Sequence, residues 1–406
     1  MVVKEKKPEI RFKGYVDDWE EGELENEVDL YSGLTYSPTN VTEKGGTFVL
    51  RSSNVKNGEI VYGDNVFVKS NAVNSDNVRE GDVIVVVRNG SRSLIGKHAQ
   101  VKGRMDNTVI GAFMTGIHSK QSAFINVLLD TKQFNKEIEK NLGATINQIT
   151  IGALKKMQFM FPDSDEQTSI GIYFKHLDEL VALHRQKYDN LLKIKRSILE
   201  NMFPKNGADV PELRFDGFTG AWEERNWEES VNISTNMVDP KLAEYDELLH
   251  IGPGNIESFT GIILDNVLKV KDSNLISGKF HFHKGDIIYG KINPQLGKYA
   301  IAPGEGLASA DSYILNTKNG VVQTFLYSIL QTKAFYNYSV SVSSRTGMPK
   351  INREELNIYN YMAPKVDEQL KIGELFVQLD SLTTHYKCEL EKLKNIKKAG
   401  LEKMFV

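Results

Sequence analysis

Residues 211–222, PELRFDGFTGAW, repeat the pattern of residues 8–19, PEIRFKGYVDDW. Pro, Glu, Arg, Phe, Gly and Trp recur at the same spacing within a chain of 406 residues. A repeat of this size indicates that one structural unit is built twice, so it takes priority over local signals. The length independently favours two or more domains, because a single hydrophobic core stops growing well below 400 residues.

The two halves match again in a strand-rich stretch. Residues 80–99, EGDVIVVVRNGSRSLIGKHA, correspond to residues 284–300, KGDIIYGKINPQLGKYA. Each stretch has Gly-Asp, an apolar run, a polar turn and Gly-Lys. The apolar runs, Val83–Val87 and Ile287–Tyr289, are typical of buried strands. The Asn-Gly and Asn-Pro pairs that follow predict that each strand ends at a turn.

A third matching stretch predicts a long helix in each half. Residues 162–181, PDSDEQTSIGIYFKHLDELV, correspond to residues 364–383, PKVDEQLKIGELFVQLDSLT. A proline ahead of each helix and Asp-Glu in each first turn suit the N-terminal end of a helix and its dipole. Apolar residues then step by four and three, which is the seam of a coiled coil. The predicted seam or partner-interface residues are Ile170, Phe174, Leu177, Val181, Tyr188, Leu191, Ile372, Phe376, Leu379, Tyr386, Leu390 and Leu393.

These stretches together predict an α+β fold of mixed α/β character. We expect globular domains at residues 1–161 and 207–363, each followed by a helix, at 162–206 and 364–406. If a pseudo-twofold axis relates the halves, the helices pair as an antiparallel coiled coil, each roughly 50 Å long. The seam is interrupted by polar or small residues, which can fix register at some cost in stability. These are His184, Lys195, Thr383, Lys397 and Gly400.

Composition sets the class of protein. The chain is 40% hydrophobic and 25% charged, which is ordinary for a soluble globular protein. We find no apolar run long enough for a transmembrane helix and no secretory signal, so we expect a cytoplasmic protein. The single cysteine, Cys388, excludes an internal disulfide and a Cys-rich zinc site. A net charge of −3 neither indicates nor excludes nucleic-acid binding, because local patches matter more.

Catalytic motifs are not found in the sequence. GSRSLIGKH at 90–98 resembles a phosphate-binding loop, but the spacing of its glycines is wrong and His98 replaces the Ser or Thr that holds magnesium. Neither a nucleophile elbow nor a dinucleotide-binding loop is present, and Asn293-Pro294-Gln295-Leu296 only begins like the pocket motif of DNA amino-methyltransferases. We therefore predict that the chain is not itself an enzyme and binds no cofactor.

Two histidines are candidates for metal binding. His281 and His283 alternate with phenylalanines, so they face the same side of a strand. No third ligand with a convincing spacing is visible, and an exposed polar face is the favoured interpretation. His184 in the seam is interpreted as a packed polar residue, and Cys388 as unreactive. The sequence therefore predicts no metal site.

Polar and basic residues cluster near the repeated turn and before the second helix. Arg and Lys suit guanine and phosphates, and Asn and Gln suit adenine, so these residues are candidates for DNA contact. A solvated loop is the competing interpretation. The candidates are Arg88, Asn89, Arg92, Lys97, Lys291, Asn293, Gln295, Lys298, Arg345 and Lys350.

The combination resembles the specificity subunit of type I restriction–modification systems. The segments that carry the resemblance are PELRFDGFTGAWEE, GDIIYGKI with its following Gly-Lys, TGMPKINREEL and the Pro…EQ…IG…LD helix openings, and it spans nearly the whole chain. It implies two target recognition domains, each reading one half of a bipartite, asymmetric sequence in double-stranded DNA, and two spacer helices that set the spacing.

The resemblance also implies partners. A specificity subunit is not catalytic and recruits two modification subunits, which use S-adenosylmethionine to methylate adenine. It also recruits two restriction subunits, which use ATP and magnesium. A bacterial or archaeal host is implied. A helix of roughly 50 Å corresponds to on the order of 15 bp of DNA, so we expect an unread spacer between the half-sites.

Two other functions stay open. A coiled-coil adaptor would bridge partner proteins without reading sequence, and a self-sufficient enzyme would catalyse methyl transfer alone. The first half also departs from the pattern, because residues 143–154, GATINQITIGAL, match TGMPKINREELN at 346–357 only loosely. We therefore place more weight on Arg345 and Lys350 than on any contact within 143–154.

Overall fold

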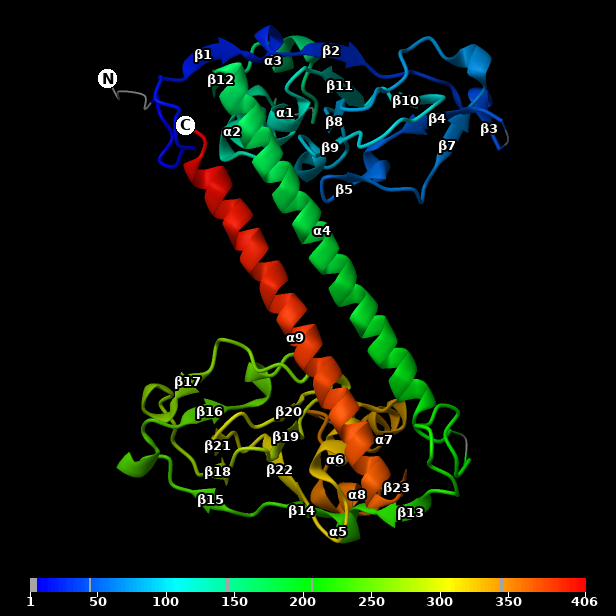
Figure 1. Cartoon of the computed structure of the whole chain (residues 1–406), viewed down its shortest axis with the longest axis vertical. Helices are drawn as coiled ribbons and strands as arrows, with labels where there is room; N and C mark the ends of the chain where they lie inside the picture. The colour runs from blue at the N-terminus through cyan, green and yellow to red at the C-terminus, as the bar shows by residue number, and fades with distance from the viewer. Residues whose placement is uncertain (1–5, 44, 143–146, 206, 344–346) are drawn as a thin grey trace. The chain divides into compact units, whose positions relative to one another are not determined.

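The computed structural model describes residues 6–43, 45–142, 147–205, 207–343 and 347–406 (Figure 1). The chain divides into two compact units, one formed by residues 1–183 with 390–406 and the other by residues 184–389. Two long helices, α4 (Ser164–Asn201) and α9 (Val366–Lys403), each contribute to both units. The mixed α/β fold predicted from the sequence is confirmed. No helix among the described residues has the length and hydropathy needed to cross a membrane.

The first unit is built around an antiparallel sheet with the strand order β2-β11-β8-β9. Its strands are β2 (Asp29–Ser32), β11 (Met114–His118), β8 (Val83–Val86) and β9 (His98–Gln100). A second sheet has the order β10-β4-β7-β3, in which β10 and β4 are parallel. Its strands are β10 (Thr108–Ile110), β4 (Thr47–Leu50), β7 (Val66–Val68) and β3 (Val41–Thr42).

Smaller elements complete the first unit. The strand β1 pairs antiparallel with β12, and β5 pairs with β6. In the described part of this unit, three α-helices contribute buried residues to the core before α4 begins. The bounds are β1 (Glu20–Glu23), β12 (Gln158–Phe161), β5 (Val55–Lys56), β6 (Glu59–Ile60), α1 (Ser122–Leu128), α2 (Lys132–Asn141) and α3 (Ile151–Lys155).

The second unit repeats this plan. Its antiparallel sheet has the order β14-β22-β19-β20, which matches β2-β11-β8-β9 strand for strand. The other sheet has the order β15-β18-β21-β16-β17 and again contains one parallel pair, β16 with β21. The strands are β14 (Val231–Ile233), β22 (Ser312–Thr317), β19 (Ile287–Gly290), β20 (Tyr299–Ile301), β15 (Met237–Val238), β18 (Lys279–Phe282), β21 (Gly306–Ala308), β16 (Leu249–Ile251) and β17 (Leu268–Lys269).

The remaining elements of the second unit follow the same scheme. The strand β13 (Glu223–Asn226) pairs with β23 (Asn360–Ala363), as β1 pairs with β12. The helices are α5 (Trp227–Ser230), α6 (Gln323–Gln331), α7 (Lys333–Ser343) and α8 (Arg353–Asn357). Every residue of β8 and β19 is buried, which confirms the two core strands predicted from their apolar runs.

The repeated Pro-Glu-x-Arg-Phe motif anchors the start of each long helix. Arg11 donates two hydrogen bonds to the Glu166 carboxylate, at 2.7 and 2.6 Å, and Arg214 donates two to Glu368, both at 2.7 Å. Both glutamates are fully buried in the first turn of their helix. A bidentate arginine supplies the partner that a buried carboxylate needs, and the helix dipole favours the same charge. The motif is therefore scaffold.

Within each unit, segments of α4 and α9 pack antiparallel. In the first unit Phe174 lies against Gly400, and Asp178 pairs with Lys397 at 2.7 Å. The residue number increases along α4 while it decreases along α9, so the two segments run in opposite directions. In the second unit His184 meets Tyr386 with ring centroids 5.8 Å apart, and Lys195 pairs with Asp380. The pairing predicted from the heptad seam is therefore present inside both units.

The predicted seam residues are all buried or half-buried. Ile170, Phe174 and Leu177 belong to the hydrophobic core of the first unit, and Ile372, Phe376 and Leu379 to that of the second. Leu390 is buried. Half-buried positions lie further from the helix starts, and they are Val181, Tyr188, Leu191, Tyr386 and Leu393. The first turns of each helix thus serve the sheet core as well as the helix pair.

Close approach explains the glycine that follows the first seam isoleucine in each helix. A Cβ on Gly171 would lie 2.7 Å from the backbone nitrogen of Phe124 in α1. A Cβ on Gly373 would lie 2.1 Å from Oγ1 of Thr324 in α6. Contacts this short are forbidden, so the Ile-Gly pair allows α1 and α6 to pack directly on the long helices.

Candidate nucleic-acid interface

In the second unit, two segments distant in sequence form one surface. After β19, the chain passes through Lys291 to the short 3-10 helix η9 (Pro294–Leu296) and returns as β20. The backbone nitrogen of Asn293 donates to the Pro349 oxygen at 2.7 Å, and that of Ile351 donates to the Lys291 oxygen at 3.0 Å. Lys350 is thereby placed beside the β19–β20 loop. The two clusters identified separately in the sequence therefore meet.

Cations gather around one tyrosine ring on this surface. The Lys291 ammonium lies 5.1 Å from the centre of the Tyr313 ring, and the Arg353 guanidinium lies 5.6 Å from it. Burial, together with the positive charges of Lys350 and Arg353, lowers the pKa of Lys291, while Asp311 acts in the opposite direction. A phosphate or a guanine edge placed here would relieve this repulsion.

Other cations near this loop are already engaged with the protein. The Arg353 guanidinium donates to the backbone oxygens of Ile233 at 2.7 Å and Ser234 at 2.6 Å, which fixes its position. The Lys298 ammonium donates to the backbone oxygen of Ile256 and ties the loop down. Gln295 is exposed, and its side chain donates to Asn293 at 3.3 Å. Arg345, also predicted to contact DNA, lies outside the described residues.

The first unit builds the same framework from different residues. The backbone nitrogen of Asn89 donates to the Asn147 oxygen at 3.2 Å, and that of Ile149 donates to the Val87 oxygen at 2.8 Å. The Asn89 side chain donates to Ser52 Oγ at 3.0 Å, and the Asn147 side chain donates to the Gly90 oxygen at 3.0 Å. The segment after residue 146 therefore lies beside the β8–β9 loop, as 349–351 lies beside β19–β20.

The remaining predicted residues of the first unit are on the surface of the same loop. Arg88 is exposed and stacks over Phe113 at 5.1 Å from the ring centre. Arg92 begins the 3-10 helix η5 (Arg92–Leu94) and is exposed, as is Lys97. Exposed, unburied cations of this kind can reach a phosphate backbone.

Matching hydrogen bonds show which positions are equivalent. Asn89 corresponds to Asn293, because their backbone nitrogens make the same hydrogen bond. Gln148 corresponds to Lys350, because each forms the same isolated β-bridge to the loop beside it. Lys97 corresponds to Lys298, because their backbone oxygens accept hydrogen bonds from the backbone nitrogens of Val86 and Gly290, respectively. Lys291 corresponds to Val87. The two surfaces thus share a backbone and differ in side chains.

Sequence reasoning missed Asn147 and Gln148. The sequence of residues 143–154 matches that of 346–357 only loosely, so it does not single out these two residues. The structure nevertheless gives residues 147–154 and 347–357 the same backbone role, with Thr150 and Asn352 as N-caps of α3 and α8. The N-cap residues are the sequence signal that could have shown the two stretches to be equivalent, since Thr and Asn are both strong N-caps.

Comparison with known proteins identifies a family. The profile described as the type I restriction modification DNA specificity domain matches residues 16–193 and 225–395, so it matches twice. The type I restriction enzyme EcoDI specificity subunit of Escherichia coli is 26% identical in an alignment of 304 residues that covers 66% of this chain and 66% of that protein, just under two thirds. The StySPI specificity subunit of Salmonella potsdam is 21% identical over 96% of this chain and 89% of that protein.

A solved structure has the same fold. The S subunit of a type I restriction–modification system from M. genitalium superimposes with a TM-score of 0.64 and 16% identity, covering 98% of this chain and 99% of that chain. The duplicated profile match, which covers most of the sequence, agrees with the duplicated architecture. The chain therefore belongs to the type I restriction–modification DNA specificity family.

Proposed function

We propose that the chain is the DNA-specificity subunit of a type I restriction–modification complex. Each unit contacts one half of a bipartite, asymmetric site in double-stranded DNA. The first half-site is read by the surface around Arg88, Asn89, Arg92 and Lys97, and the second by the surface around Lys291, Asn293, Gln295 and Lys350. Lys298 and Arg345 belong to the same prediction for the second surface. A bacterial or archaeal cytoplasm is the place where such a subunit meets chromosomal DNA.

The observation that carries the proposal is the duplicated loop framework with different side chains. Asn89 and Asn293 occupy equivalent positions, whereas Gln148 of the first unit corresponds to Lys350 of the second, and the buried Val87 corresponds to Lys291. Amide side chains pair with adenine, and lysine pairs with guanine or phosphate, so the two surfaces favour different bases. A bridging adaptor would have no need of two chemically distinct polar loops on one scaffold.

The long helices offer surface for partner subunits. Large apolar side chains are exposed on both, and two pairs occupy equivalent positions of the repeat, Leu180 with Leu382 and Ile194 with Ile396, each 43–49% exposed. Apolar side chains that recur at the same exposed positions of both helices suggest that each helix offers a partner the same contact. We assign them to docking of the two modification subunits. S-adenosylmethionine, ATP and magnesium belong to the modification and restriction subunits, and the chain supplies no catalytic group.

Selection of bound sequences tests the function. The chain, co-purified with its modification subunits, is incubated with a randomised DNA library, and bound sequences are enriched at two salt concentrations. We expect a split motif with two specified halves around an unspecified spacer, and affinity that falls with salt as phosphate contacts are lost. Enrichment of no motif with retained DNA binding would instead support the adaptor. Methyl transfer by the chain without partners would support the self-sufficient enzyme.

A further inference from the structure

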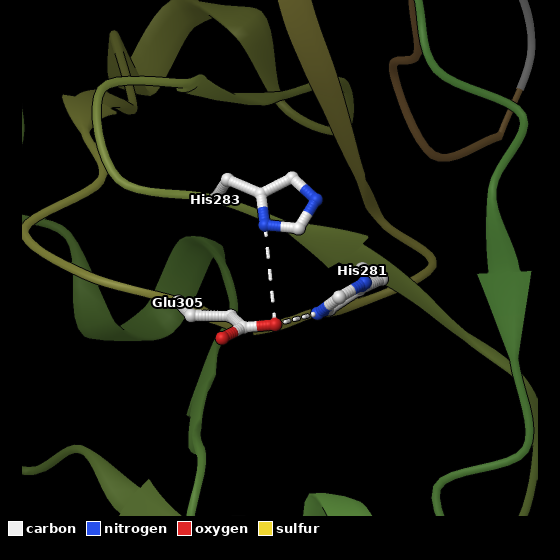
Figure 2. A group of neighbouring side chains, drawn as sticks. All are labelled: His281, His283 and Glu305. Atoms are coloured by element: carbon white, nitrogen blue, oxygen red, sulfur yellow. Dashed lines mark hydrogen bonds and ion pairs between the residues drawn. The ribbon is translucent and has the colours of Figure 1, made fainter.

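Three potential metal ligands meet at one end of the strand pair β18–β21. His281 lies in β18, His283 follows its end, and Glu305 precedes β21. The two strands pair antiparallel, with Phe282 opposite Gly306, so Glu305 lies across from His283. Figure 2 shows the Glu305 carboxylate pointing between the two imidazole rings. The strand geometry thus converges three side chains that the sequence separates.

The distances are close to those of a coordination site. One Glu305 oxygen is 2.7 Å from Nε2 of His281 and 3.9 Å from Nδ1 of His283. The three ligand atoms lie within 4.8 Å of one another. Metal–ligand bonds of about 2.0–2.2 Å at tetrahedral angles place ligand atoms roughly 3.3–3.6 Å apart. Glu305 and His283 are both exposed, so their side chains have room to change rotamer towards that geometry.

The scaffold holds part of this cluster in place. The His281 side chain is only 13% exposed and packs against Tyr245, with ring centroids 5.7 Å apart. The backbone nitrogen of His283 donates to the Asp286 carboxylate at 2.8 Å, which fixes the turn between β18 and β19. The His283 side chain is 67% exposed, which leaves the outer side open to water. His281 is therefore held in place before metal binds, and the exposed His283 and Glu305 side chains would move to complete the site.

We propose that His281, His283 and Glu305 bind a divalent transition metal such as Zn²⁺. Two imidazole nitrogens and one carboxylate are a common protein ligand set for zinc, with water in the remaining position. Magnesium prefers an octahedron of oxygen ligands, which this cluster does not supply. The prediction that the chain has no metal site rested on the missing third ligand. Glu305 supplies it from the segment just before β21, where sequence spacing gives no signal.

The first unit provides an internal comparison. Arg79 corresponds to His283, because its backbone nitrogen makes the same bond to Asp82, at 2.9 Å, that His283 makes to Asp286. Asn77 then corresponds to His281. Asn107, immediately before β10, corresponds to Glu305 before β21. Asn, Arg and Asn cannot form a zinc site, so the metal is specific to the second unit.

Bound metal would join β18 to the segment before β21 at the end of the sheet. A ligand that binds the folded state and not the unfolded state stabilises it by mass action. Zinc is therefore expected to raise the unfolding temperature of the wild-type chain and not that of a variant without the site. This inference does not depend on DNA recognition, and either can fail alone.

The test uses the full chain with its affinity tag removed, since polyhistidine binds the same metals. Zn²⁺ alone is titrated calorimetrically into wild type, His283→Ala, Glu305→Gln and a matched control, His176→Ala. His176 is an exposed histidine of α4 outside the cluster. Circular dichroism checks that each variant is folded, and Mg²⁺ is titrated in parallel.

We expect one zinc per chain in wild type and in the control, with no binding of Mg²⁺. Both site variants should lose at least the roughly 10–100-fold in affinity that removal of a supporting residue costs in known sites. Zinc should raise the unfolding temperature only where it binds. Failure of wild type to bind, or equal binding by wild type and both folded site variants, would overturn the proposal.

Discussion

At the scale of single residues, Arg11 and Arg214 show what the sequence reveals. Their motif is visible as a repeat, and the aromatic residues Phe215, Phe218 and Trp222 favour a role as scaffold. The partners Glu166 and Glu368 could not, because a buried ion pair joins residues far apart in the chain. The same limit applies to the interface. Residue types near the turns were identifiable, but only the structure shows that Lys298 is tied to Ile256 and that Gln148 matches Lys350.

Lys350 gives the prediction at this scale. Lys350→Ala should weaken binding of the second half-site and leave the first unchanged, by about 1–3 kcal/mol with relaxed base preference if the ammonium reads a base edge. Equal weakening for all sequences, with a shallower salt dependence, would identify a phosphate contact. Competition binding with DNA substituted in one half at a time measures both.

Lys318→Ala is the matched control. Lys318 is an exposed lysine that follows β22. The pairing of Gly290 with Ser312 places it at the far end of this sheet from Lys291. Its removal should leave both half-sites bound as in wild type. Loss of binding in the control, or none in Lys350→Ala, would remove Lys350 from the interface.

At the scale of elements, the long helices were the most predictable part of the fold. The heptad seam and the capping residues lie close together in sequence, so their pattern can be read directly. Their apparent defects could not be interpreted without the structure. Gly400 makes room for Phe174, and Lys397 pairs with Asp178 and with Asp130, which lies between α1 and α2. Contacts between the two helices join residues far apart in the chain, so they leave no pattern in the local sequence.

Asp130 predicts a pH dependence for the first unit. Burial alone would raise its pKa, but His98 and Lys397 lower the pKa of Asp130 to about 2, below its ordinary value of 3.8. A carboxylate with a lowered folded-state pKa stabilises the fold above its unfolded pKa and loses that contribution as pH falls through the folded value. Wild type should therefore be more stable than Asp130→Asn above about pH 4, and the difference should shrink towards pH 2.

Urea unfolding of both proteins across this range, followed by circular dichroism, measures the difference. His98→Gln serves as a second comparison, because it removes one of the two groups that lower the pKa. A difference that grows as the pH falls below 4 would contradict the assignment.

Leu382 gives the prediction for the outer helix surface. Leu382→Glu should keep the fold, because the side chain is 47% exposed, and should weaken docking of the modification subunit by about 2 kcal/mol if it is an interface hot spot. Co-purification at several partner concentrations measures the loss. Glu374→Gln, an exposed position on the same helix, is the control for charge. Normal docking by Leu382→Glu would exclude this surface.

At the scale of the whole molecule, duplication carries most of the information. The repeat in the sequence predicted two α/β units, each with a long helix, because the scaffold residues recur in both halves. Matching sheets in the two units agree with this. The recognised bases could not be predicted. They depend on a few side chains in loops, such as Asn89 with Gln148 and Asn293 with Lys350. Tertiary contacts place these side chains beside one another, and no code relates residue to base.

The most direct test of the central claim is a comparison of methylomes. This gene alone is deleted in its host, and adenine methylation is mapped by long-read sequencing before and after. The account predicts loss of one bipartite motif with an unspecified spacer, restored when the gene is supplied in trans. An unchanged methylome, or loss of a continuous motif, would contradict it.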